Sequence, residues 1–364
     1  MKERIVSFDA LRFILAMCVV FGHTFLVLFR THAEETLDIQ NLAVDGFFIL
    51  SGFLLALSYN KSQENTPDAA ILFIRSTWHR IKRLAPEYLF ALLLANLLYI
   101  KHFSASAFFL NSLFIGQINK VPSAINGAWY VSVLFWVGCI YSALLFYKKK
   151  TAVYVFIPLL VFFSFSYMYA TYSSLSLNAN PLIDNIFSAG FLKGFVGMGI
   201  GILLFFLCQK MQTLTCSLRY RQLSFLVLEI VALVALIYCL SLDIRIKDQY
   251  LIYFAYPVIL ALLYFRKEVL LKFLSCEIWS QLTPSAYMLY LTHHIVIQFT
   301  KDYLPYKSFP QISIYILIMV VCVIFGLICQ SLCQKSFIGL KKLLFLADEE
   351  KSPVKGIKKK ELLC

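Results

Sequence analysis

The sequence predicts an all-α integral membrane protein with about ten transmembrane helices. The chain has 364 residues, of which 60% are hydrophobic and 15% charged, and its mean hydropathy is +0.76. A soluble domain of this length could not bury so much apolar surface. Apolar stretches of about 20 residues, the length of helix that crosses a bilayer, recur along the whole chain.

Each apolar stretch is interpreted as one membrane span. The spans are predicted near residues 10–29, 42–59, 85–101, 127–147, 152–170, 189–208, 223–241, 249–265, 282–300 and 312–334. With a cytoplasmic amino terminus, 24 of the 33 Lys and Arg fall in inside segments, seven in outside loops and two within spans. This bias follows the positive-inside rule, so we expect ten helices with both termini in the cytoplasm.

The predicted domains are a membrane domain over residues 1–334 and a basic cytoplasmic tail over 335–364. Most of the net charge of +13 lies on the predicted inner side, where it favours anionic lipid as a partner rather than nucleic acid. The ten cysteines show no metal-binding spacing, so we expect free thiols and no metal site.

The first span carries two polar residues within "FDALRFILAMCVVFGH". Arg12 and His23 are eleven residues apart, which returns them to within about 20° of one helix face and separates them by about 16 Å along the axis. Both are therefore expected to face one slot in the bundle, with Arg12 at its cytoplasmic end. Two alternatives stay open: Arg12 extends to the headgroups, paired with Asp9, and His23 makes only a helix–helix hydrogen bond.

The second span, "NLAVDGFFILSGFLL", places Asp45 at about the depth of His23. We expect the two to pair, because a carboxylate raises the basicity of an imidazole, as a general base requires. The alternative is that Asp45 caps the second helix near the surface. Ser51 and Gly52 permit close approach, either of a slender ligand or simply of another helix.

Three motifs in this order resemble the bacterial membrane acyltransferase-3 family, ten-helix O-acyltransferases that modify surface polysaccharides. Arg12 and His23 match the family's Arg-x10-His pattern, and "FFILSG" at 47–52 matches its Phe-Phe-x-x-Ser-Gly. "RIKRLAP", with Arg80 and Arg83, matches its Arg-x-x-Arg followed by Pro.

Two weaker matches follow later in the chain. "NGAWYVSVLFWVGCIY" is similar to the family's Trp-containing fourth helix, although the Glu that many members carry there is missing. "SAYMLYLTHH" is similar to a late-helix segment that places His293 at the family's histidine.

The resemblance implies that the donor is cytoplasmic acyl-CoA, most simply acetyl-CoA, used as a co-substrate with no tightly bound cofactor. Arg12, Arg80 and Arg83 are then expected to hold its phosphates, because guanidinium groups bind phosphate with a planar set of donors. Basic inner loops that only orient the chain in the membrane are the alternative for Arg80 and Arg83.

The pantetheine arm is expected to pass Ser51 and Gly52 and to bring the thioester to His23. His23, oriented by Asp45, would deprotonate a hydroxyl of a surface glycan, such as O-antigen or capsule, or of a lipid-linked sugar. Direct transfer and a covalent acyl-histidine relay both fit the sequence. The resemblance also implies a multi-pass protein of the bacterial inner membrane.

Three further residues are candidates for the acceptor side. Lys193 contacts the acceptor or extends to the membrane surface, and Trp129 belongs to an interfacial belt or stacks on a sugar. Of the neighbours His293 and His294, only one is expected to face a shared site, and we favour His293. Glu87 and Glu229, at the ends of spans, are interpreted as surface groups.

The competing function is a transporter or flippase, since ten helices and intramembrane charge are common in that class. Transporters of this kind often contain inverted repeats, and we detect none in the sequence.

Overall fold

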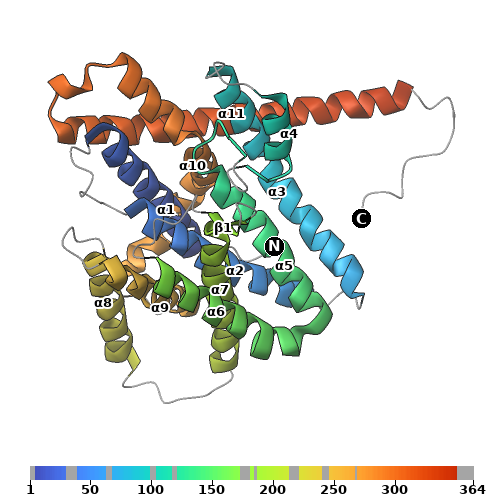
Figure 1. Ribbon diagram of the computed structural model, residues 1–364, viewed down its shortest axis with the longest axis vertical. Coiled ribbons are helices and arrows are strands. Elements are labelled where there is room, and N and C mark those ends of the chain that lie inside the picture. The colour runs from blue at the N-terminus through green and yellow to red at the C-terminus, as the bar shows by residue number, and fades with distance from the viewer. Residues whose placement is uncertain are drawn as a thin grey trace.

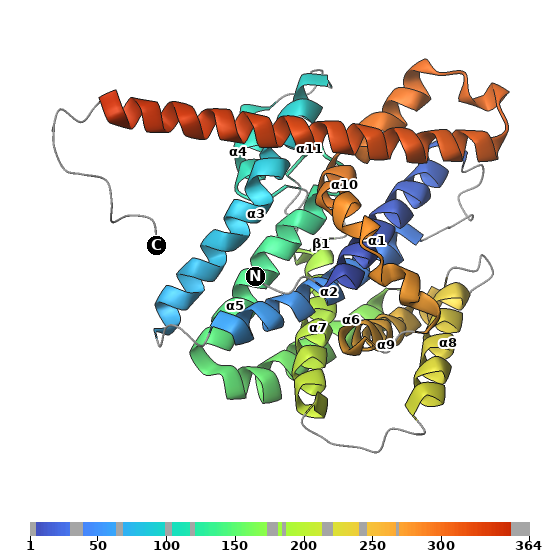
Figure 2. The ribbon, with the colours of Figure 1, turned by 180° about the vertical axis from the view of Figure 1, so that it is seen from behind.

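In the part of the chain that the computed structural model describes, the regular elements are helices and one short pair of strands (Figures 1 and 2). The structure describes residues 5–29, 39–62, 68–98, 104–116, 121–172, 181–183, 187–212, 221–239, 246–266 and 269–350. The larger helices are α1 (Val6–Thr24), α2 (Ile39–Ser62), α3 (Ala69–Leu98), α4 (Ala105–Ser112), α5 (Ala128–Thr151), α6 (Ile157–Thr171), α7 (Gly190–Gln212), α8 (Arg221–Cys239), α9 (Ile252–Phe265), α10 (Ile278–Tyr303) and α11 (Gln311–Glu350).

Short elements join or extend these helices. They are η1 (Phe25–Phe29), η3 (Ala152–Phe156), η4 (Ile246–Leu251), η5 (Leu270–Ser275), η6 (Tyr306–Ser308), and the antiparallel strands β1 (Pro181–Ile183) and β2 (Phe187–Ser188).

The helical character predicted for the chain is confirmed, and each of the ten predicted spans overlaps a helix. Five described segments are long and apolar enough to cross a membrane: Val6–Phe29, Ile39–Ser62, Ala128–Thr171, Gly190–Gln212 and Gln311–Ser336. Two predicted spans lie within one of these segments, on either side of a kink at Lys148. The count of ten spans and the cytoplasmic placement of both termini stay predictions.

Helices α2 and α7 lie near the centre of the bundle in both views (Figures 1 and 2). They can approach backbone to backbone because glycines remove the side chains between them. A methyl group on Gly52 would collide with the carbonyl of Met198, and one on Gly201 would collide with the carbonyl of Ile49. This crossing fixes the face that α2 turns toward its other neighbours.

The segment before α5 is anchored by hydrogen bonds on both sides. Asn111 of α4 contacts the Tyr88 hydroxyl of α3 at 3.3 Å and donates to the Pro122 carbonyl at 2.8 Å. Gly127 immediately precedes α5 and has φ of +90°, a left-handed conformation that glycine adopts without strain. Its carbonyl accepts a hydrogen bond from the Tyr290 hydroxyl at 3.2 Å, which ties the start of α5 to α10.

Helix α11 runs across one end of the bundle and extends beyond it (Figure 1). It continues without a break to Glu350, so the predicted change from span to tail at residue 335 is not marked by a helix end. The rest of the predicted tail, residues 351–364, lies outside the described residues.

Candidate active site

Two histidines from distant parts of the chain meet between α1 and α10. Nδ1 of His23 lies 3.0 Å from Nε2 of His293, and Nδ1 of His293 lies 2.6 Å from the Tyr290 carbonyl. Because a carbonyl only accepts, His293 carries its proton on Nδ1 and accepts on Nε2. His23 therefore donates from Nδ1, and its Nε2 carries the lone pair that a general base needs.

A third imidazole belongs to the same cluster. The His294 ring centroid lies 4.6 Å from that of His23, and its Nε2 lies 2.6 Å from the side-chain amide of Asn126. Each of the three histidines offers a ring nitrogen within 4.8 Å of the other two. The prediction that only one of the adjacent histidines could face a shared site is therefore wrong, because His23 sits close enough to reach both rings.

Asp45 is not the partner of His23, and this prediction is corrected. Its Oδ2 lies 3.1 Å from Nζ of Lys193 on α7, and its Oδ1 accepts from the Tyr253 hydroxyl of α9 at 2.9 Å. Asp45 and Phe47 are two residues apart and so face nearly opposite sides of α2. Phe47 contacts the ring of Tyr290 on α10, whereas Asp45 faces α7 and α9.

Lys193 is fully buried in the ion pair with Asp45, so its predicted extension to the membrane surface is wrong. Asp45 is also fully buried, so the alternative that it caps α2 near the surface is wrong as well. The two charges pair with each other inside the protein, as buried charges in membrane proteins usually do.

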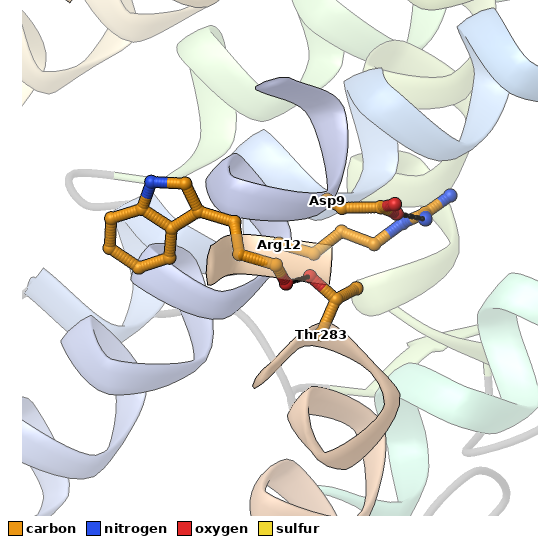
Figure 3. Close-up of polar contacts among 4 residues, drawn as sticks. Asp9, Arg12 and Thr283 are labelled. Carbon is orange, nitrogen blue, oxygen red and sulfur yellow. Dashed lines mark hydrogen bonds and ion pairs between the residues drawn. The ribbon is translucent and has the colours of Figure 1, made fainter. Parts of the chain in front are cut away.

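At the other end of α1, Arg12 pairs with Asp9 of the preceding turn. Nη1 of Arg12 lies 2.8 Å from Oδ1 of Asp9, as the alternative reading of the sequence proposed. Figure 3 shows this pair beside Thr283 of α10. The Arg12 charge also interacts with Arg83 of α3 and with Tyr130 of α5, so Arg12 faces the interior of the bundle.

Arg80 and Arg83, the two residues of α3 that are predicted to bind the phosphates of acyl-CoA, differ in their surroundings. Arg83 is exposed. Arg80 is half-buried against α5, where it donates to the Leu134 carbonyl at 3.3 Å and its guanidinium covers Gly138. Nε of Arg80 is buried without a hydrogen-bond partner among the described residues, which leaves one donor for a ligand.

Two tyrosines connect the arginines with the histidines. Tyr130 interacts with the charges of Arg12 and Arg83 and hydrogen-bonds with Ser51. Its ring lies 5.1 Å from that of Tyr290, whose carbonyl holds His293. We refer to the whole set as the Arg–Tyr–His track; its members are Arg12, Arg83, Tyr130, Tyr290, His293 and His23. The sequence did not single out these tyrosines, because they are two of 21 in an apolar chain.

Two other predicted site residues pack inside the protein. The space beside Gly52 is filled by the backbone of Met198, so helix packing explains this glycine and its predicted contact with a ligand is wrong. Trp129 is buried against Gly190 and Phe48, so it does not belong to an interfacial belt.

Glu229 was wrongly interpreted as a surface group. It is fully buried on α8, and its carboxylate accepts hydrogen bonds of 2.7, 3.0 and 2.7 Å from the backbone N–H groups of Val269, Leu270 and Leu271. Glu87 is half-buried and accepts from Gln330 of α11 at 2.9 Å. Both carboxylates therefore fix neighbouring segments.

A family model described as an acyltransferase domain matches residues 5–330. The chain belongs to the acyltransferase-3 family. A search of curated proteins found no match. The matched range contains the whole Arg–Tyr–His track. The family and the five long apolar segments together indicate a multi-pass membrane acyltransferase.

Proposed function

We propose that this acyltransferase moves an acetyl group from cytoplasmic acetyl-CoA to a hydroxyl of a surface glycan or its lipid-linked precursor, in the inner membrane of a bacterium. The contact between His23 and His293 carries the proposal. It joins His23 and His293, the two histidines that match motifs of the family. It also leaves the lone pair of His23 on Nε2. The acetyl group and the glycan acceptor come from the resemblance to the family.

The arginine end of the track supports the choice of an acyl-CoA donor. Arg83 is exposed, and the Arg12 guanidinium lies within its electrostatic reach. Arg12 is already paired with Asp9, so the exposed guanidinium of Arg83 provides the main positive charge for a donor phosphate at the predicted cytoplasmic side. Arg80 adds the unpartnered Nε next to them.

We expect the flexible arm of the donor to follow the track. About 16 Å of helix separates Arg12 from His23, and the contact between Tyr130 and Tyr290 connects the two ends of the track. Ser51 joins this wall through its hydrogen bond with Tyr130, whereas Gly52 does not. An arm lying along the tyrosines would place its thioester next to the histidine pair.

The chemistry assigned to the pair is general-base catalysis. Nε2 of His23 takes the proton of the acceptor hydroxyl while the hydroxyl oxygen attacks the thioester carbonyl. The C–S bond then breaks, and the thiolate of CoA takes that proton back from His23. The Nε2 lone pair of His293 stabilises the imidazolium through the Nδ1–H of His23, the role that the sequence had given to Asp45.

The test is CoA release by full-length protein in detergent or proteoliposomes, together with mass spectrometry of glycans from cells with and without the gene. We expect an acetyl mass on the glycan that depends on the gene and is lost with His23→Ala. The matched control is His79→Ala, an exposed histidine on α3. Activity retained in His23→Ala would contradict the proposal. Acetyl mass on the protein without acceptor would indicate the relay instead.

A further inference from the structure

We propose that His23, His293 and His294 form a zinc site, and that zinc bound there blocks acyl transfer. Their ring nitrogens lie within 4.8 Å of one another. Tetrahedral zinc with Zn–N bonds of about 2.1 Å needs donors about 3.4 Å apart. The His23–His293 pair is already at 3.0 Å, and no pair of ligand atoms in the cluster is farther apart than 4.8 Å, so a small shift brings the third donor into range.

The surroundings of the cluster also resemble those of a zinc site. Zinc-binding histidines usually fix their second ring nitrogen on a carbonyl, carboxylate or other polar group. His293 uses Nδ1 for the Tyr290 carbonyl, and His294 uses Nε2 for the side-chain amide of Asn126. Nε2 of His293 therefore has a free lone pair. Nε2 of His294 accepts from the Asn126 amide nitrogen, so Nδ1 of His294 becomes a ligand only when its proton moves to Nε2 and the amide turns its oxygen toward that nitrogen. His23 supplies the third ligand atom.

Three imidazoles favour zinc or a similar borderline transition ion over magnesium or calcium, which prefer oxygen ligands. Three protein ligands leave the fourth tetrahedral position for water. The donors come from both α1 and α10, so the ion also links the two helices.

Inhibition follows from where the proton goes. In the hydrogen-bonded pair, the Nδ1 proton of His23 lies between His23 and His293. Zinc takes its place, with Nδ1 of His23 and Nε2 of His293 as ligands, and the proton moves to Nε2 of His23. His23 stays neutral but no longer has a lone pair facing the acceptor. This second half of the inference rests on the proposed function, whereas zinc binding does not.

Binding is tested by calorimetric titration of the full-length chain in detergent with Zn²⁺. We expect one equivalent to bind and His294→Gln to weaken its affinity at least about tenfold, while His79→Gln leaves it unchanged. If His294→Gln does not yield monodisperse protein, the zinc affinity of His293→Gln tests the same prediction, because this variant also removes one ligand. Affinity that is equal in the wild type and in the cluster variants would overturn the site.

Inhibition is tested with the acyl-transfer assay. We expect Zn²⁺ to inhibit the wild type and a chelator to restore it. Measured relative to its own activity without zinc, His294→Gln should need at least about tenfold more zinc for half-inhibition. Zinc binding that depends on His294 in a chain without transferase activity would contradict the proposed function alone. Transferase activity without such binding would overturn the zinc site alone.

Discussion

Lys193 of α7 and Asp45 of α2 form an ion pair of 3.1 Å in which both side chains are fully inaccessible. The Tyr253 hydroxyl of α9 donates a hydrogen bond to the other carboxylate oxygen, Oδ1. Three helices therefore meet at one buried carboxylate. It is separate from the histidine cluster.

Replacing only one partner of this ion pair should destabilise the protein more than replacing both. Lys193→Met leaves an unpaired buried carboxylate, so we expect a loss of ~3–5 kcal/mol in unfolding free energy. The double variant Asp45→Asn with Lys193→Met should recover part of that loss. Thermal unfolding in detergent measures both, with Lys210→Met at the exposed end of α7 as the control. A double variant less stable than Lys193→Met would contradict the pairing.

His293 should act through the orientation of His23. His293→Phe removes the acceptor for Nδ1–H, and losing a hydrogen bond of about 1.4 kcal/mol corresponds to about tenfold in kcat. His293→Gln keeps an acceptor oxygen, so its kcat should fall less. KM for acyl-CoA should stay the same in both variants. Equal losses of kcat in the two variants would argue against an orienting role.

Arg83 should contribute to donor affinity. Arg83→Gln removes a charge-assisted contact worth ~1.5–3 kcal/mol, so we expect about 10- to 150-fold weaker acetyl-CoA binding. Arg75→Gln changes an exposed arginine of the same helix and serves as the control. Calorimetry at two salt concentrations measures the effect, since screening should weaken wild-type binding more. Unchanged affinity in Arg83→Gln would remove Arg83 from the donor site.

Gly52 should matter for stability and not for donor binding. An added methyl group would collide with the backbone of Met198, which cannot move as freely as a side chain. We expect Gly52→Ala to lose ~1–3 kcal/mol of stability, as overpacking typically does, with acetyl-CoA affinity of the folded protein unchanged. In the control Gly326→Ala, the nearest atom lies at 3.2 Å, so its loss should be smaller.

Glu229 should hold the segment that starts at Val269. Glu229→Ala removes the acceptor of three backbone N–H groups, and each lost hydrogen bond to a charged acceptor costs ~1.5–3 kcal/mol. Hydrogen exchange at Val269, Leu270 and Leu271 should therefore become faster. Glu277→Ala, at an exposed carboxylate, should leave these amides protected. Unchanged exchange in Glu229→Ala would show that the segment is held by other contacts.

The sequence predicted residue pairs well within a helix and poorly between helices. The shared face of Arg12 and His23 follows from helical periodicity, and both side chains belong to the track. The pairing of Asp45 with His23 required the rotation of α2 relative to α1, which depth in the membrane does not give. The choice of His293 was useful because a family motif, and not periodicity, located it.

The sequence by itself determined the helices, their approximate bounds and the family, because a chain this apolar must satisfy its backbone within helices and the motifs are local. Only the tertiary structure decided that His23 meets His293 and that Asp45 meets Lys193. The physical reason is that lipid and protein interior are equally apolar, so hydrophobic periodicity does not reveal which face of a membrane helix contacts its neighbours. Close packing at glycines and the pairing of buried polar groups set those faces instead.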